Sequence, residues 1–523
     1  MVLKKITKES VILLLLGLIV YMPFMAGQLN NADGFTNGVL YHGDNYGWED
    51  AQGRFFLRFF DLWRDGMIVP EVIVFVSIVM ISVAIFLLWQ TLDIQKEIER
   101  ILIGALVLFS PSVANLFTYY YCADAYCLAF LFAVIAAYLL IKNTKYSLGI
   151  AVVLLVISMG IYQTYVGVTI SICGIWIIKE ILNNQIEIKT LIGKTISFAI
   201  GVVGAAISYL GLFKFLEVVG YLKPTGTRGM NNMLGNMIGH LSDMIRMAYG
   251  VFYDYFFTDN IINNSWRFRR TFNFAICVAT ILLILFIIYK KQVYRSFLKL
   301  IILVGAIAVF PIMLTVIVIL APEANVYAET GMLMLAYMNL LYILPIAVLG
   351  ILSDEVKERI IGFGIYTLSS IMIVIMVLFI GVFVRTIELE QTKIQHLAYQ
   401  MENRIENIEG YAADMTVLVV GRPHNGNYPF VSHKLHDITK GMISRYSLTF
   451  GMAEQVSNSW IQLFQYYCGV NYTECDKARR EEIITSDEFK HMGNFPEQTS
   501  VKKIGDVIVV KLSMDTESII GMR

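Results

Sequence analysis

Long apolar runs constrain this chain more than any other feature of its sequence, because they recur through the first 385 residues with few charges inside them. A helix of about 20 residues crosses the hydrocarbon core of a bilayer. Of the 523 residues, 57% are hydrophobic and only 16% are charged, which is typical of multi-span helical membrane proteins. We therefore predict a polytopic α-helical membrane protein with about eleven transmembrane helices. The predicted spans are 11–26, 67–89, 101–118, 125–141, 147–161, 164–178, 195–218, 271–289, 297–320, 331–352 and 360–385.

Basic residues indicate which ends of these spans face the cytoplasm. Lysine and arginine are enriched in cytoplasmic connections, and here they gather before the first span and in alternate later connections, from Lys4 and Lys5 to Lys357 and Arg359. We expect a cytoplasmic amino terminus, an uncleaved first helix and an outer carboxyl terminus. The formal net charge is zero and basic tracts are absent, so nucleic acid is not an expected partner.

The connection between the first two spans, residues 28–66, carries most of the groups able to do chemistry. It would be the first loop outside the membrane, and its ionisable residues alternate with glycines and aromatics. We expect the catalytic carboxylate of an enzyme with this sequence to lie in this loop. Its ionisable candidates are Asp33, His42, Asp44, Glu49, Asp50, Arg54 and Arg58.

Two breaks in the apolar pattern should face the same side as this first loop. Ser110 and Pro111 interrupt the third run, and Asp124 begins the next one, where a carboxylate is costly unless it is solvated, paired or used. Asp124 could equally cap a helix, because acidic residues favour the first helical turn. Tyr162 and Gln163 interrupt a second apolar stretch, as interfacial anchors or as ligands.

The long outer loop, residues 219–270, carries a different chemistry. Apolar residues recur there at helical spacing, which predicts a helix lying flat in the outer leaflet. Arginines follow Trp266, and guanidinium groups bind phosphate oxygens bidentately, so they fit a lipid phosphate or simple anchoring to headgroups. The periodic residues are Met233, Met237, Leu241, Met244 and Ile245, and the arginines are Arg267, Arg269 and Arg270.

The chain changes character near Glu388. Residues 388–523 combine a polar helical stretch (Glu388–Glu409) with strand-like runs at Met415–Val420 and Asp506–Leu512. We predict a small extracytoplasmic α/β domain, following a transmembrane domain over residues 1–387. Cys468 and Cys475 flank a short segment in which a disulfide could form, and the sequence leaves that open.

Several activities lack their motifs. No Walker-type glycine loop, zinc-protease helix or nucleophile elbow occurs, so ATP-driven transport by this chain is not expected. Cys122 and Cys127 have no partners at zinc-ligand spacing. We expect no required cofactor. A divalent metal at Asp33 and Asp44 stays open, although nothing in their spacing demands one.

Three external stretches and the carboxyl-terminal strands resemble the bacterial O-antigen glucosyltransferases of the Gtr type. The first loop is similar in its early Asp33, its Trp48 and the Gly53–Arg54 pair before the second span. Residues 111–126 are similar to that family's segment with proline, Asn-Leu, tyrosine and aspartate, and MGIYQTY is similar to its Tyr-Gln break. The chain departs from the family by having Tyr120–Tyr121 where an arginine often follows the tyrosine, and a lone Asp33 where paired acids are common.

The resemblance implies a polytopic GT-C glycosyltransferase of the bacterial cytoplasmic membrane. It would move a hexose, glucose or N-acetylglucosamine, from a polyprenyl-phosphate (undecaprenyl-type) sugar to a cell-surface polysaccharide outside the cytoplasm. Asp33 is then the first candidate for the general base and Asp44 the second. Expected substrate-binding residues are Trp48, Arg54, Tyr120, Asp124, Tyr162, Gln163, Arg267, Arg269, Arg270 and Lys511.

Three other hypotheses compete with this interpretation. A flippase or transporter of lipid-linked sugar would explain the spans, but its polar groups should lie near the membrane midplane. A ligase or polymerase would use a polyprenyl-diphosphate glycan instead. A scaffold without activity fits least well with the acids and arginines outside.

Overall fold

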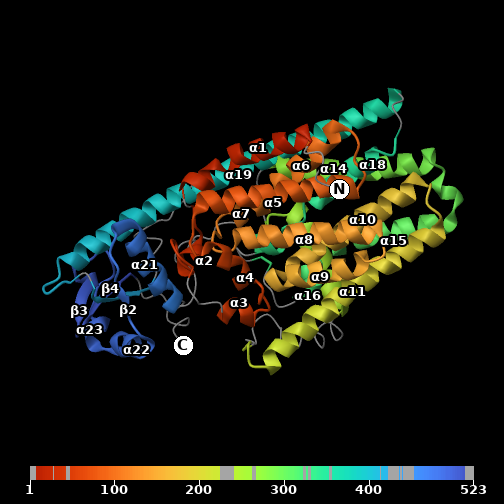
Figure 1. The fold of residues 1–523 in the computed structure, drawn as a ribbon. Helices are drawn as coiled ribbons and strands as arrows, with labels where there is room; N and C mark the ends of the chain where they lie inside the picture. Colours follow the sequence, from red (N-terminus) through yellow and green to blue (C-terminus); the bar gives the residue numbers. More distant parts are fainter. Residues whose placement is uncertain are drawn as a thin grey trace.

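The computed structural model describes residues 7–27, 29–42, 47–223, 241–261, 267–321, 326–327, 331–352, 356–412, 414–421, 435, 439 and 453–512. The described chain is mostly helical, and its long helices pack side by side (Figure 1). Eight of the described helices are long and apolar enough to cross a membrane, which is consistent with a polytopic membrane protein. They are α1 (Lys8–Gly27), α5 (Pro70–Thr91), α8 (Ala123–Lys142), α10 (Val166–Asn183), α11 (Ile188–Val218), α14 (Arg267–Lys290), α15 (Phe297–Leu314) and α19 (Val356–Glu406).

The predicted count of eleven spans is not confirmed. The runs at 147–161 and 331–352 form only the shorter apolar helices α9 (Ser147–Ile161) and α18 (Leu340–Leu349), the latter preceded by α17 (Gly331–Met334). The run at 101–118 divides into α6 (Glu97–Leu108) and α7 (Pro111–Leu116), because proline has no N–H to continue a helix and Ser110 caps the new one. The remaining helices of this region are α13 (Leu241–Phe257) and α16 (Ile317–Leu320), with 3-10 turns at Val293–Arg295 and elsewhere.

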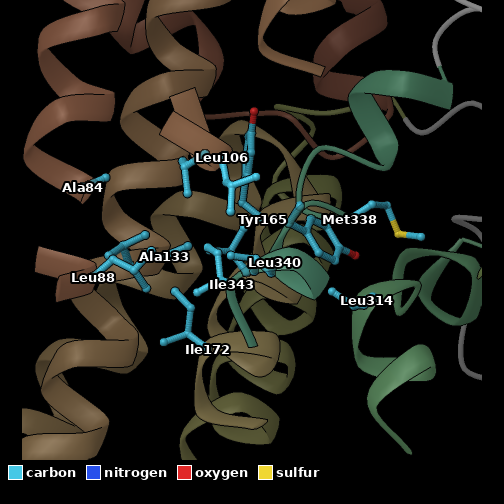
Figure 2. Packing of buried hydrophobic residues seen from close by; sticks show 14 of the residues in the cluster. Ala84, Leu88, Leu106, Ala133, Tyr165, Ile172, Leu314, Met338, Leu340 and Ile343 are labelled. Carbon is cyan, nitrogen blue, oxygen red and sulfur yellow. The ribbon is translucent and has the colours of Figure 1, made fainter. Parts of the chain in front are cut away.

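Helix α8 lies at the centre of the bundle and packs against α5, α9 and α10. Its buried face carries small side chains, Ala129, Ala133 and Ala137, which let neighbouring backbones approach closely. Figure 2 shows Ala133 among larger buried residues, including Leu106 of α6, Ile172 of α10 and Ile343 of α18. This packing fixes the helix ends from which the first loop and the two breaks project.

The carboxyl-terminal region contains a four-stranded sheet beyond the bundle. Helix α19 runs along the bundle and continues to this sheet. The short helices α2 (Ala32–Thr36), α3 (Gly47–Ala51) and α4 (Leu57–Asp61) lie at the same end (Figure 1). The strand order is β2-β1-β4-β3, with β1 parallel to both β2 and β4 and with β3 antiparallel to β4. The elements are β1 (Thr416–Val420), α21 (Ala453–Cys468), β2 (Thr473–Glu474), α22 (Lys477–Thr485), α23 (Asp487–Lys490), a 3-10 turn (Gln498–Ser500), β3 (Val501–Ile504) and β4 (Val507–Lys511).

Both faces of this sheet are buried, in two separate apolar clusters. Val417 and Val419 of β1 face α19 and α21, whereas Leu418 and Val420 face α22 and α23, as the two-residue period of a strand requires. Cys468 packs against the first cluster and Cys475 belongs to the second, and both are free thiols. The disulfide that the sequence left open is therefore not formed.

Candidate active site

The described part of the first loop folds into four short helical segments that dock on the two breaks. They are α2 (Ala32–Thr36), α3 (Gly47–Ala51), α4 (Leu57–Asp61) and a 3-10 turn (Leu62–Arg64). Asn31 caps α2 by accepting from Gly34 N at 2.8 Å, and its Nδ2 donates to Thr118 Oγ1 at 2.9 Å. Thr118 O also accepts from Asn31 N at 3.2 Å. These bonds fix α2, and hence Asp33, against the segment that follows α7.

The second break holds the other half of the loop. Gln163 lies in a 3-10 turn (Gln163–Tyr165), and its Nε2 donates to Gln52 O at 2.7 Å and to the Tyr209 hydroxyl at 2.9 Å. Tyr209 in turn donates to Gly53 O at 2.9 Å. Gly160 accepts from Phe56 N, and a Cβ there would lie 2.3 Å from the Phe56 ring, so this close approach requires glycine. The structure thus brings the first loop and both breaks together at one end of the bundle.

Four ionisable residues of the loop form one electrostatic group, which we call the acidic cluster: Asp33, His42, Glu49 and Arg54. Burial raises the pKa of the Glu49 carboxyl; the charges of Arg54 and His42 oppose that rise, and the charge of Asp33 adds to it. Glu49 is only 3% exposed, whereas Asp33 is half-buried. Asp33 is therefore the more accessible carboxylate of the pair.

Tyrosines from both breaks line this cluster. The Arg54 guanidinium lies 4.8 Å from the centre of the Tyr162 ring, a cation–π geometry. Tyr162 stacks on Tyr126 of α8 at 4.5 Å, and the Tyr121 ring lies 5.1 Å from His42. A wall of aromatic rings beside carboxylates suits a sugar, which presents both apolar C–H faces and hydroxyls.

Buried polar atoms without hydrogen-bond partners concentrate in Glu49–Arg54. Within the described residues, no partner is found for Glu49 Oε2, Asp50 Oδ1, Gln52 Nε2, Gln52 Oε1 or Arg54 Nε. Buried polar atoms in folded proteins nearly always have partners. Five such atoms in six consecutive residues mark this segment as the place where a polar ligand could supply the missing bonds.

An ion pair ties α3 to α4, and its arginine also contacts the segment that follows α11. Arg58 forms an ion pair with Asp50, donates to the Tyr221 hydroxyl at 2.8 Å and lies 5.0 Å from the centre of that ring. Tyr221 lies three residues beyond the end of α11 at Val218. Helix α11 thus contacts the loop through Tyr209, and the segment that follows the helix contacts it through Tyr221.

Asp124 is paired within the protein. Its carboxylate accepts from Trp63 Nε1 at 3.0 Å and from Arg64 Nε at 3.1 Å, and its Oδ1 accepts from Ala125 N at 3.0 Å in the first turn of α8. Arg64 is buried and also donates to Tyr121 O and Met67 O. We expected Asp124 to orient a sugar or the base, or to cap a helix. The structure gives it an ion pair and a place in the first turn of α8.

Tyr120 and Lys511 also make bonds within the protein. The buried Tyr120 hydroxyl donates to Phe24 O at 2.7 Å and accepts from Leu29 N at 2.9 Å, closing the end of α1. Lys511 Nζ donates to Met492 O at 2.8 Å and to Phe489 O at 3.3 Å. Substrate binding by Tyr120 and Lys511 stays a prediction, and the contacts described for both side chains are within the protein.

Some of the remaining expected residues are described by the structure, and others are not. Arg269 is buried, 5.4 Å from the centre of the Tyr255 ring, and its Nη1 has no hydrogen-bond partner among the described residues, whereas Arg270 is exposed. Asp44, Met233 and Met237, and the side chains of Trp48 and Arg267, lie outside the described residues. Met244 is buried in α13, which packs against α14 and α15.

Sequence reasoning missed Arg64, Tyr121, Tyr126 and Tyr209, and it named Glu49 without choosing it. The one available signal was the unexplained carboxylate Asp124, which predicts a cationic partner, and Arg64 is the last arginine before the second span. No group of three or more potential metal ligands (His, Cys, Asp or Glu) occurs in the part of the chain that the structure describes.

Comparison with protein families gives a match. The model of the family described as glucosyl transferase GtrII matches residues 35–346, more than half of the chain. The chain belongs to this family. The resemblance drawn from the sequence motifs is thus confirmed, and membership together with the long apolar helices indicates a glycosyltransferase located in a membrane. The matched residues include Glu49, Arg54 and both breaks, and they begin two residues after Asp33. Neither the curated proteins nor the solved structures gave a match.

Proposed function

We propose that this glycosyltransferase moves a hexose, glucose or N-acetylglucosamine, from a polyprenyl-phosphate sugar to a cell-surface glycan on the outer face of the bacterial cytoplasmic membrane. The five unpartnered polar atoms of Glu49–Arg54, beside Asp33 and the tyrosine wall, carry the proposal. Sugar hydroxyls can both donate and accept, so a hexose bound there would supply partners to carboxylate, amide and guanidinium groups alike. In this account the amino terminus is cytoplasmic and the carboxyl-terminal sheet is extracytoplasmic.

The proposed reaction is a single displacement at the anomeric carbon. An acceptor hydroxyl oxygen forms the new bond to that carbon, and the bond to the phosphate oxygen breaks with its electron pair remaining on the polyprenyl phosphate. The hydroxyl proton passes to a carboxylate acting as general base. Asp33 is the candidate base because it is the accessible carboxylate of the acidic cluster. Attack from the opposite side inverts the anomeric configuration.

Arginines supply the charge that the donor phosphate needs. Arg54 lies within the acidic cluster and against Tyr162, and Arg269 is buried beside Tyr255 with Nη1 unpartnered among the described residues. Charge-assisted hydrogen bonds from guanidinium to phosphate are among the stronger ones in proteins. We assign Arg54 to the phosphate of the reacting sugar, and Tyr162 and Gln163 to the walls that position the hexose.

Transfer of radiolabelled sugar tests this function. The purified full chain in nanodiscs receives polyprenyl-phosphate glucose or polyprenyl-phosphate N-acetylglucosamine and membrane glycan as acceptor. We expect transfer from one of these donors, with inversion at the anomeric carbon. Transfer only from a polyprenyl-diphosphate glycan would instead indicate a ligase. Lipid binding without transfer or donor hydrolysis would indicate a flippase.

A further inference from the structure

The first loop presents a row of large apolar side chains that no described part of the protein covers. We call this row the apolar edge. Monomeric proteins rarely leave such contiguous patches exposed unless they meet a membrane or a partner. Each side chain of the edge is at least half exposed: Leu40 (52%), Tyr41 (54%), Phe59 (52%), Leu62 (69%), Trp63 (53%) and Met67 (52%).

Two strand-like segments and a helical turn hold the edge together. His42 N donates to Gly66 O at 2.8 Å, Ile68 N donates to Leu40 O at 2.9 Å, and Tyr41 and Met67 form an antiparallel bridge. Gly66 has a φ of +72°, and a Cβ at this position would lie 2.6 Å from His42 O, so the turn requires glycine. Helix α4 and the following 3-10 turn lie between these segments in the chain and add Phe59, Leu62 and Trp63.

The ion pair beneath the edge fixes its position on the bundle. Arg64 is buried and joins the edge to the first turn of α8 through Asp124, while Trp63 Nε1 donates to the same carboxylate. Trp63 therefore has its polar end bonded inward and half of its ring surface outward. The edge is a fixed surface at the end of α8.

The apolar edge also continues the outward face of a membrane-spanning helix. Helix α5 begins three residues after Met67, and Val69, Val72 and Phe75 at its start are 41%, 43% and 46% exposed. Exposed apolar side chains on a helix of such hydropathy are those that face lipid. Tyrosine and tryptophan are enriched at the membrane–water interface, and Tyr41 and Trp63 both precede the first residue of α5 in the chain.

We propose that the apolar edge is a membrane-binding surface seated in the bilayer interface, so that the first loop rests on lipid. The occupant is the interfacial layer of the bilayer leaflet at this end of α5. The loop would then hold the acidic cluster at the level of the leaflet surface. If the proposed function is also right, a lipid-linked sugar phosphate would reach Asp33 and Arg54 without leaving its leaflet.

Spin labelling of the full chain in nanodiscs tests this surface without requiring activity. A nitroxide is attached at Leu62→Cys in a background where Cys277→Ala and Cys468→Ala remove the two cysteines that are not buried. Val72→Cys on α5 is the lipid-facing reference, and a label at the exposed Lys490 of α23 (Lys490→Cys) is the water-facing reference. We expect oxygen to broaden the spectrum of the label at 62 as much as the spectrum of the label at 72. A water-soluble nickel chelate should broaden the spectrum of the label at 62 several-fold less than that of the label at 490.

A label at 62 that matches the label at 490 would overturn the proposal, and would mean that the edge faces water or another protein. Quenching of tryptophan fluorescence by lipids brominated near the headgroup is a second measurement. The wild type should lose more fluorescence than Trp63→Phe, because Trp63 would lie at that depth. Equal quenching of both proteins would also contradict the proposal.

Discussion

Asp33 and Glu49 are two carboxylates of one loop with different surroundings. Glu49 is enclosed in α3 and its pKa is raised by burial, whereas Asp33 in α2 is half-buried beside it. Active sites give different roles to two similar acids by placing them in environments that move their pKa values apart. We assign proton acceptance to Asp33 and place Glu49 beside it as a buried group that shapes the local field.

The raised pKa of Glu49 makes a prediction about stability and pH. Between 4.5, its ordinary value, and the raised pKa, the folded chain holds a proton that the unfolded chain has lost. Rising pH through this window therefore lowers the free energy of unfolding. Glu49→Gln removes this titration. We expect the Tm of the wild type in detergent to fall relative to that of Glu49→Gln as pH rises through the window, and to level off above it.

The comparison is made by thermal unfolding of both proteins across the same pH series. The difference between the two Tm values is the measured quantity, because it cancels the titration of groups that do not interact with Glu49. A difference that stayed constant from pH 4 to pH 8 would mean that Glu49 titrates alike in the folded and unfolded chains.

Helix α2, which carries Asp33, is held from two sides. Asn31 bonds it to Thr118 in the bundle, while Phe35 and Val39 are buried in the apolar cluster that α19 and α21 form on one face of the sheet. Trp460 of α21 belongs to the same cluster and is fully buried. The carboxyl-terminal region thus positions the candidate base, although none of its residues described here joins the acidic cluster.

Phe35→Ala and Trp460→Ala should therefore lower activity from a distance. Truncating a buried aromatic side chain costs about 3–5 kcal/mol of local stability, which loosens α2. We expect each variant to lower kcat with little change in KM for the donor. The double variant should lose less than the product of the two effects, because both side chains belong to one apolar cluster. Steady-state transfer kinetics in nanodiscs measure both constants.

Ile483→Ala is the matched control. Ile483 is equally buried but lies in the cluster on the opposite face of the sheet. It should lower the stability of the carboxyl-terminal region while kcat stays near that of the wild type. If Ile483→Ala lowered kcat as much as Phe35→Ala, general unfolding rather than positioning of α2 would explain the loss.

The architecture of the molecule could be predicted from sequence where the cause was local. The break at Ser110–Pro111 and strands β1 and β4 were predicted within a residue or two, because proline, helix caps and β-branched runs act over a few residues. The predicted count of eleven membrane-spanning helices is not confirmed, because α9 and α18 are apolar but shorter than the eight long helices among the described residues.

In the candidate site, too, features with a local cause were predicted and contacts made by the tertiary fold were not. The sequence identified the first loop and both breaks, and the structure brings them together. The sequence could not predict that Arg64 pairs with Asp124, or that Phe35 shares an apolar cluster with Trp460 more than 400 residues later, because only the tertiary fold creates these arrangements. The internal hydrogen bonds of Tyr120 and Lys511 could not be predicted for the same reason, because their partners are distant in the sequence or set by the fold.

The central claim is that sugar transfer occurs at the acidic cluster with Asp33 as the base. Its most direct test is the rate of transfer from the polyprenyl-phosphate hexose by Asp33→Asn, compared with Asp65→Asn, an exposed aspartate of the same loop. Loss of a general base lowers the rate by about 10²–10⁴-fold. We predict such a loss for Asp33→Asn and near wild-type transfer for Asp65→Asn. A folded Asp33→Asn protein with full activity would contradict the account.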